Sequence, residues 1–260
     1  MNPIVSASCG ALATLRDAIA AQLRRTNYAG RTVTLAEGIA VHAGLIVLTA
    51  RRDRPVASIA LVGIGLLGLA DDLLEPRRRA RGEPQAKGLR GHLGALAHGR
   101  LTTGVAKALG IPALAGLAAI ERLGPRRPMR LLADTALVAG AANLVNLLDL
   151  RPGRALKAVI VPAALLRSGA VLLPAALALP VDLAERGMLG DTGANALGAA
   201  LGTVACERMG PLPRTVLLTG VVLLTLASER ISFTAVIEST PTLRAIDQLG
   251  RRSGDDGERV

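Results

Sequence analysis

The residues best suited to chemistry are acids in otherwise apolar surroundings. Asp71 and Asp72 are adjacent near the end of an apolar run, and Asp191 lies between glycines in Leu189-Gly190-Asp191-Thr192-Gly193. Adjacent carboxylates repel each other unless a cation shares them, and Mg²⁺ would bring phosphate oxygens with it. The backbone N–H groups that begin a helix at Asp191 could also hold phosphate. The alternatives are hydration of the aspartate pair in the headgroup region and a simple N-cap at Asp191.

A third polar group combines two amides and a carboxylate. Asn143, Asn146 and Asp149 follow one another at intervals of three residues. Steps of three on a helix of 3.6 residues per turn form one slanted stripe. Such a stripe could bind a nucleotide or a sugar, and the alternative is hydrogen bonding between helices.

The composition indicates which kind of protein positions these residues. Of 260 residues, 50% are hydrophobic, the mean hydropathy is +0.42 and the net charge is +11. So much apolar sequence excludes disorder, and an aromatic content of 1% leaves almost nothing to stack on nucleic-acid bases. Cys9 and Cys206 make neither a disulfide framework nor a zinc site. The pattern is typical of a polytopic membrane protein with arginine-rich cytoplasmic loops.

The apolar runs predict an all-α fold, a transmembrane helical bundle of about eight spans with cytoplasmic loops forming the site. The stretch 155–181 is interrupted around Arg167–Gly169, which favours two short or re-entrant helices over one. Residues 1–23 are expected to form an interfacial helix or a degraded first span, 24–250 the membrane domain, and 251–260 a flexible cytoplasmic tail. The other predicted spans are 33–50, 55–74, 101–119, 131–149, 191–208 and 213–230.

The distribution of arginines predicts the direction of the spans. The loop 75–100 is the most basic in the chain, so we place it in the cytoplasm. With two helices in 155–181, all three acidic motifs then lie on the cytoplasmic side. The segment 121–130 is expected outside although it carries four arginines.

Glycines in two places favour close helix packing. Gly63-Ile64-Gly65-Leu66-Leu67-Gly68 matches G-x-G-x-x-G, but no βαβ pattern surrounds it, so a dinucleotide site is not expected. Gly198 and Gly202 form a helix-contact motif.

The motifs, taken in order, resemble those of the polyprenyl-phosphate N-acetylhexosamine-1-phosphate transferases, the family that includes phospho-MurNAc-pentapeptide translocase (glycosyltransferase family 4). The resemblance runs from about Asn27 to Gly250. Its other matching segments are Asn27-Tyr28-Ala29-Gly30-Arg31, Lys87-Gly88 and Gly99-Arg100-Leu101-Thr102-Thr103-Gly104.

This resemblance implies an enzyme that moves an amino-sugar-1-phosphate from a UDP-sugar to polyprenyl phosphate, with Mg²⁺ as cofactor and UMP as leaving group. Asp71 would deprotonate or position the lipid phosphate. The implied catalytic residues are Asp71, Asp72 and Asp149, the metal ligands Asp191 and Asp72, and the substrate-binding residues Asn27, Lys87, Asn143, Asn146 and Thr192.

The resemblance also implies a setting. It places the protein in the bacterial inner membrane, with a cytoplasmic active face, in cell-wall glycan synthesis. The expected partners are polyprenyl phosphate and the UDP-amino sugar. No nucleic-acid partner is expected, and a homodimer remains an alternative to a monomer.

Departures from the family pattern leave two alternatives to an active transferase. Glu75 stands where translocase members carry lysine, and no histidine follows His98. The chain therefore resembles a divergent, shortened member with a simpler or different donor. One alternative is a non-catalytic descendant that binds lipid phosphate or envelope-assembly partners. The other is an unrelated transporter or channel, whose acids would be distributed along the depth of the membrane.

Overall fold

A computed structural model describes residues 14, 16–82, 94 and 102–252 of the chain. The fold is all-α apart from one small hairpin, which confirms the predicted class. Residues 16–23 are helical, and β1 (Arg24–Thr26) then pairs antiparallel with β2 (Thr32–Thr34). The helices are α2 (Ala36–Thr49), α3 (Pro55–Ala80), α5 (Thr103–Leu123), α6 (Pro128–Leu148), α7 (Arg154–Leu165), α8 (Gly169–Leu183), α9 (Gly190–Arg208), α10 (Pro211–Ser228), α11 (Phe233–Ser239) and α12 (Pro241–Gln248).

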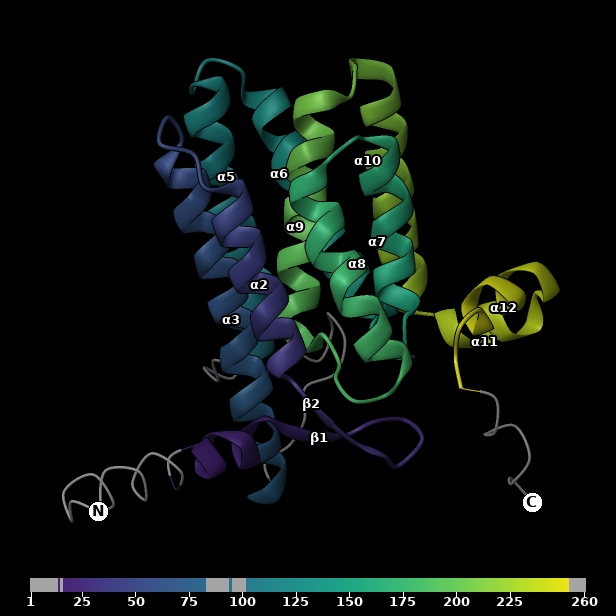
Figure 1. The fold of residues 1–260 in the computed structure, drawn as a ribbon. Helices are drawn as coiled ribbons and strands as arrows, with labels where there is room; N and C mark the ends of the chain where they lie inside the picture. Colours follow the sequence, from purple (N-terminus) through teal and green to yellow (C-terminus); the bar gives the residue numbers. More distant parts are fainter. Residues whose placement is uncertain (1–13, 15, 83–93, 95–101, 253–260) are drawn as a thin grey trace, which may run out of the picture.

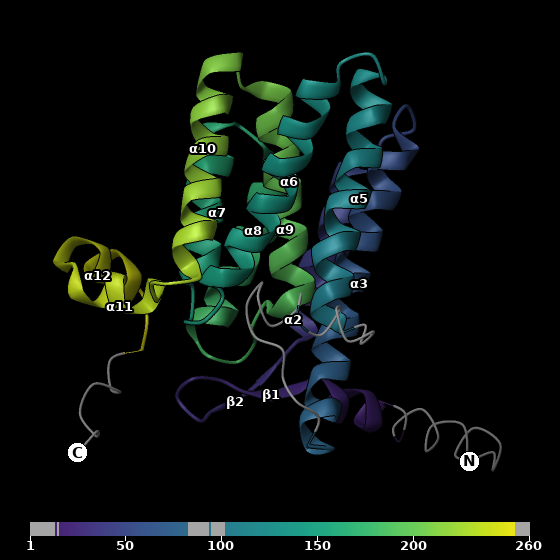
Figure 2. The same ribbon diagram turned by 180° about the vertical axis from the view of Figure 1, so that it is seen from behind.

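The helices α2 to α10 form an upright bundle in which successive helices run in opposite directions (Figure 1). The β1–β2 hairpin lies across its lower end, and α11 and α12 extend sideways from that end. The view from behind shows α3 beside α5 and α10 at the far edge (Figure 2). The end of the bundle that carries the hairpin is called the hairpin end below.

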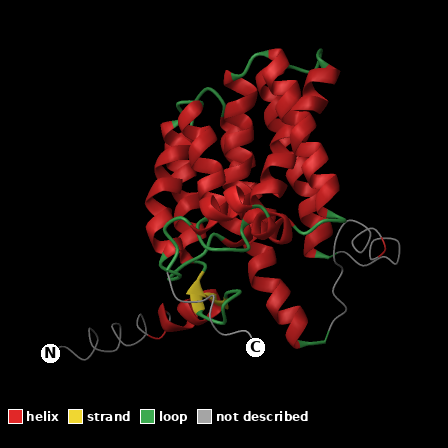
Figure 3. Cartoon of the chain, turned by 90° about the vertical axis from the view of Figure 1, so that its right-hand side faces the viewer, coloured by secondary structure: helices red, strands yellow, loops and turns green. Residues whose placement is uncertain are grey.

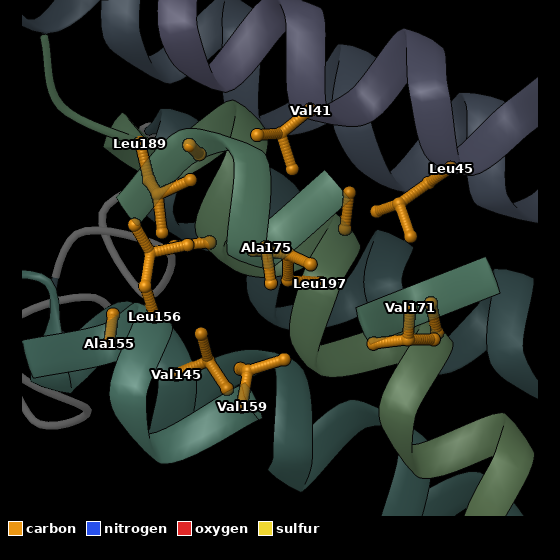
Figure 4. Packing of buried hydrophobic residues seen from close by; sticks show 14 of the residues in the cluster. Val41, Leu45, Val145, Ala155, Leu156, Val159, Val171, Ala175, Leu189 and Leu197 are labelled. Atoms are coloured by element: carbon orange, nitrogen blue, oxygen red, sulfur yellow. The ribbon is translucent and has the colours of Figure 1, made fainter. Parts of the chain in front are cut away.

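Helix α9 is the centre of the bundle, and two hydrophobic clusters share it. One cluster joins α9 to α2, α7 and α8 through residues such as Leu45, Leu156 and Leu197 (Figure 4). A Cβ on Gly198 would lie 2.3 Å from the carbonyl oxygen of Ala141 in α6. The backbones of α9 and α6 therefore touch, as the small-residue motif predicts.

The outer surface of the bundle is apolar, as expected of a protein surrounded by lipid. Large apolar side chains face outward on most of its helices, and Val47, Leu177 and Leu212 are each more than two-thirds exposed. Four described helices are long and apolar enough to cross a membrane, namely α3, α5, α6 and α10.

The predicted number of about eight spans is not confirmed. Helices α7 and α8 have 12 and 15 residues, about 18 and 22 Å, which is short of the hydrocarbon thickness. Helix α2 is also short, and α9 begins with polar residues and is rich in glycine and alanine.

Most predicted spans agree with the helices to within a few residues, including the division of 155–181 into α7 and α8. The exception is α3, which continues to Ala80 and projects beyond the bundle (Figure 3). Pro76 lies inside this extension and lacks the N–H that would reach the carbonyl of Asp72. The Arg25 guanidinium of β1 donates to that carbonyl instead. A side chain from the hairpin thus replaces the missing helical hydrogen bond.

Two of the four arginines in the segment 121–130 have a structural explanation. Asp134 of α6 is almost fully buried, and it pairs with Arg122, with Arg130 at 4.0 Å and with Arg214 at 3.6 Å. One buried carboxylate therefore holds three of the basic side chains at the end of the bundle opposite the hairpin. Such a cluster gives Arg122 and Arg130 a role within the fold, whereas Arg126 and Arg127 are exposed.

Candidate functional site

Asp72 holds the beginning of α9. Its Oδ1 accepts from the backbone N–H of Asp191 at 3.0 Å. Its Oδ2 accepts from the backbone N–H of Thr192 at 3.0 Å and from the Thr192 hydroxyl at 2.7 Å. A carboxylate on α3 therefore satisfies N–H groups that a helix N-terminus leaves without partners. Both Asp72 oxygens are engaged, and Thr192 is buried.

Two glycines permit this contact. A Cβ on Gly68 of α3 would lie 2.4 Å from the carbonyl oxygen of Asp191. Gly190 has a φ of +57° and brings its backbone to the Asp72 carboxylate. A side chain on Gly68 would separate the helices, and an L-residue at 190 would be strained. The glycines of both motifs therefore bring Asp72 and Asp191 together.

Lys107 of α5 bridges two of the predicted site residues. Its Nζ lies 2.5 Å from Asp71 Oδ2 and also hydrogen-bonds to Asp191 Oδ2. The three side chains come from α5, α3 and α9, and they are 16%, 15% and 23% exposed. The cluster is therefore mostly sheltered from solvent but not fully buried. Lys107, Asp71, Asp72 and Asp191 are called the carboxylate–lysine cluster below.

Sequence reasoning missed Lys107 as a site residue. A lone lysine within an apolar span is costly unless it has a partner or a function, and that signal was available in the sequence. What the sequence alone does not indicate is the identity of its partners, because they lie 36 and 84 positions away along the chain.

The polar stripe of α6 reaches the same end of the bundle. Asn143 and Asn146 are partly exposed, and their amides make no hydrogen bond within the described part of the chain. Asp149 follows the end of α6 and interacts with Asp182 and Asp191. Burial raises the pKa of Asp149 well above its ordinary value, and those two carboxylates raise it further. The stripe thus offers amides that are available for hydrogen bonding and a carboxyl group beside the cluster.

The hairpin covers this end of the bundle without contributing Asn27 to the cluster. Asn27 donates to Glu185 Oε2 at 2.6 Å, and its Oδ1 accepts from the N–H groups of Ala29 and Arg31 at 2.9 Å. Arg31 also pairs with Glu185 at 3.0 Å. These contacts fix the turn of the hairpin against the segment that precedes α9. Lys87, the remaining predicted substrate-binding residue, lies outside the described residues.

Glu37 is a further acid that sequence reasoning missed. It lies in the first turn of α2 and is buried, and neither carboxylate oxygen has a hydrogen-bond partner among the described residues. Its carboxylate lies against Gly187, in the segment before α9. No sequence pattern distinguishes it from a solvated acid near the start of a helix.

The carboxylates of the cluster offer oxygen ligands of the kind that Mg²⁺ prefers. Within the described ranges, no three or more histidine, cysteine or acidic side chains gather as a metal site. Mg²⁺, however, is usually held by one or two carboxylates together with substrate phosphates and water. Asp71 and Asp191 both reach the Lys107 ammonium, so they could share a divalent ion once that ammonium moves aside.

Comparison with known proteins adds no relative: no protein-family model, no curated protein and no solved structure matches this chain.

Proposed function

We propose that this chain is a membrane enzyme that transfers an amino-sugar-1-phosphate from a UDP-sugar to polyprenyl phosphate. The observation that carries the proposal is the carboxylate–lysine cluster. Asp71, Asp191 and Lys107 belong to three different helices, yet their charged atoms meet at one end of the bundle. A transferase with a membrane-bound acceptor needs such charges at the edge of the apolar layer, where a lipid phosphate and a water-soluble donor can meet.

The transfer exchanges one phosphoanhydride bond for another. An oxygen of the lipid phosphate forms a bond to the phosphorus that carries the sugar, and the bond from that phosphorus to UMP breaks. Phosphoryl transfer depends on positioning and on charge neutralisation rather than on covalent chemistry by the protein. The requirement is therefore a set of fixed charges, which the cluster can supply.

The described residues divide this work between them. Asp71 positions the lipid phosphate and accepts its proton. Lys107 provides positive charge for the phosphate oxygens. Asp72 positions Asp191 by holding the first turn of α9. The amides of Asn143 and Asn146, with Asp149, hydrogen-bond the nucleotide sugar.

Mg²⁺ belongs to the proposal, with Asp191 and Asp71 as the carboxylates that would hold it. When bound, it would neutralise charge on the donor diphosphate. Asp72 was predicted as a ligand too, but here both of its oxygens accept hydrogen bonds from α9. We therefore assign Asp72 to positioning.

One observation favours the non-catalytic alternative. The Lys107 ammonium pairs with both Asp71 and Asp191 and offsets part of their negative charge without a metal or a substrate. A protein that only binds lipid phosphate could use the same arrangement. The transporter alternative has less support, because the acids that approach one another gather at one end of the bundle instead of following its length.

An exchange assay in membranes tests the proposal. It contains labelled UMP, polyprenyl phosphate and one of several UDP-sugars, including UDP-GlcNAc, with Mg²⁺ or with a chelator. We expect Mg²⁺-dependent appearance of label in the UDP-sugar for the native chain. Asp71→Asn and Asp191→Asn should abolish it. No exchange with any donor, from folded protein that still binds polyprenyl phosphate, would favour the non-catalytic alternative.

Asp53→Asn provides the matched control for these variants. Asp53 is exposed and lies between α2 and α3 at the opposite end of the bundle. Its ion pairs within the described chain are with the neighbouring Arg51 and Arg54. The Asp53→Asn substitution changes charge and side-chain size in the same way as Asp71→Asn and Asp191→Asn, but far from the cluster. Exchange should therefore continue. Loss of exchange in this variant as well would show that the assay reports expression or folding instead of the cluster.

A further inference from the structure

A cavity lies at the end of the bundle opposite the carboxylate–lysine cluster. Its volume is about 220 Å³, and it is lined by the end of α2, the start of α3, parts of α5, α6 and α9, and the turn between α7 and α8. Arg54 at its rim and Asp72 of the cluster are 18 residues apart along the chain, which corresponds to about 27 Å of helix. The cavity and the cluster therefore lie near opposite faces of an apolar layer about 30 Å thick.

The cavity exists because small side chains meet where large ones would fill the space. Ala57 of α3, Ala115 and Ala118 of α5, and Ala199 of α9 line it, together with larger apolar residues such as Leu61. An engineered apolar cavity of about 150 Å³ is large enough to bind benzene and does not hold water. This cavity is larger and is surrounded by an outer surface suited to lipid, so a hydrocarbon chain is its natural occupant.

The rim of the cavity is basic, and one of its arginines has no acidic partner among the described residues. Arg51 pairs with Asp53 at 3.1 Å, and Arg54 pairs with Glu207 at 2.5 Å. Arg208 donates through Nη1 to the carbonyl of Leu166 at 2.6 Å and pairs with no carboxylate of the described chain. A guanidinium has five N–H donors in a fork that suits phosphate. Arg208 therefore has donors left for an anion beside the apolar cavity.

We propose that this cavity binds one acyl chain of an anionic phospholipid, whose phosphate contacts Arg208. The apolar walls select a hydrocarbon chain, and the unbalanced positive charge at the rim selects an anionic headgroup over a zwitterionic one. The bound lipid belongs to the membrane face opposite the carboxylate–lysine cluster. This inference does not rest on the proposed transferase function, because it uses none of the cluster residues.

Photo-crosslinking in detergent tests the location of the lipid. The probe is phosphatidylglycerol with a diazirine on one acyl chain, and phosphatidylcholine with the same chain serves as the comparison. We expect crosslinks within the segments 57–64 and 199–204, with about tenfold less labelling by phosphatidylcholine at equal concentration. Labelling spread evenly over the outward faces of all helices, or equal labelling by both lipids, would overturn the proposal.

Arg208→Gln tests the headgroup contact. Competition by unlabelled phosphatidylglycerol should need about tenfold more lipid in this variant, as expected when one charge-assisted hydrogen bond is lost. Arg52→Gln is the matched control, because Arg52 is exposed in the α2–α3 loop at the same end of the bundle but does not line the cavity. The control should match the native chain within about twofold. Equal competition curves for both variants would overturn the role of Arg208.

Ala118→Leu tests the chain-binding cavity by filling it. It should abolish crosslinking within 57–64 and 199–204. Ala113→Leu is the matched control on the exposed face of the same helix, and it should leave the crosslinks unchanged. Ala57→Leu fills the cavity from α3 and keeps the test decisive if Ala118→Leu does not fold. Unchanged crosslinks in a folded cavity-filling variant would overturn the proposal.

Discussion

At the scale of single residues, the decisive feature is an ammonium group placed where two carboxylates converge. Lys107 pairs with both Asp71 and Asp191 in a site that is mostly closed to solvent. Removing one partner from such a group leaves the others with uncompensated charge. The cluster is therefore a candidate binding site and also a place where single substitutions are expected to destabilise the fold. Its residues can be tested separately.

Lys107→Met should make the cluster depend on a divalent cation. Without the ammonium, Asp71 and Asp191 repel each other, and Mg²⁺ becomes the cation that relieves the repulsion. We expect Mg²⁺ to raise the Tm of this variant, with a stabilisation of about 2.7 kcal/mol at a concentration of 100 Kd. The native chain and Lys107→Arg, which keeps the charge, should respond less. Equal Tm shifts in all three proteins would contradict the assignment of these carboxylates to the metal.

Asp72→Asn should loosen the start of α9. Both carboxylate oxygens accept hydrogen bonds, so the amide must turn its N–H₂ group toward a donor in either orientation. The expected loss in unfolding free energy is about 2–3 kcal/mol, measured by denaturation in detergent. Thr192→Val removes only the hydroxyl donor and should cost about 1 kcal/mol. A smaller loss for Asp72→Asn than for Thr192→Val would show that Asp72 does not hold this helix.

At the scale of elements, the packing of α3 against α9 determines whether the cluster forms. These helices touch at Gly68, and α9 also contacts α6 at Gly198. Both contacts are between backbones, so they tolerate no side chain at the glycine. The α11–α12 segment depends instead on charged contacts at the hairpin end.

Gly68→Ala should separate α3 from α9 and displace Asp191. Its Cβ would lie 2.4 Å from the carbonyl oxygen of Asp191, and neither backbone can yield as a side chain would. The expected cost is about 1–3 kcal/mol in unfolding free energy, as for other overpacked sites. Gly220→Ala in α10 is the control, because nothing lies within 4 Å of its Cβ. It should be neutral or stabilising by less than about 1 kcal/mol, and a comparable loss in both variants would contradict the close-contact explanation.

The attachment of α12 should weaken in acid. Asp247 binds the buried Arg154 at 2.8 Å and Arg251 at 2.7 Å. Burial alone would raise the pKa of Asp247, but the hydrogen bond from Arg154 and the charge of Arg251 bring it below its ordinary value. A lowered folded pKa stabilises the attachment fully above about pH 3.9, the unfolded value. That stabilisation is lost as the pH falls through the folded pKa.

Hydrogen exchange of the α12 amides, corrected for the intrinsic effect of pH, measures this attachment. Protection should stay constant between pH 7 and pH 5 and fall in more acidic solution. Asp247→Asn should remove the protection at every pH. Glu238→Gln, which alters an exposed acid of α11 that pairs with Arg151, should behave as the native chain does. Protection that persists in Asp247→Asn would rule out the carboxylate as the anchor.

At the scale of the whole molecule, both ends of the bundle carry arginines, and one end pairs several of them with a buried acid. At the end opposite the hairpin, Arg122, Arg130 and Arg214 surround the buried Asp134. At the hairpin end, the arginines on the projecting part of α3 are largely exposed. Arg52, Arg126 and Arg127 at the opposite end are exposed as well, so the proposed orientation rests on the predicted cytoplasmic loop 75–100 and requires a direct test.

Cysteine labelling tests this orientation. Arg79→Cys lies on the projecting end of α3, and Arg126→Cys lies in the exposed turn before α6. A membrane-impermeant maleimide added to intact cells should label Arg126→Cys, and it should label Arg79→Cys only after permeabilisation. The native chain is the control for its own thiols, and its Cys206 is buried. Labelling of Arg79→Cys in intact cells would reverse the proposed topology.

The sequence by itself determined the apolar periodicity, the helix boundaries to within a few residues and the two-helix division of 155–181. These are local properties, since run length and interruptions need no knowledge of distant neighbours. The acids of the three motifs were also recognisable, because polar groups stand out in apolar segments.

Only the tertiary structure decided how those acids are used. Lys107 bridges Asp71 and Asp191, and both oxygens of Asp72 hold the first turn of α9. The extension of α3 depends on a similar distant contact, since Arg25 takes over the carbonyl that Pro76 cannot reach. Each of these partners is tens of residues away along the chain. Their pairing depends on which helices pack together, and small-residue contacts such as the one at Gly68 determine that packing.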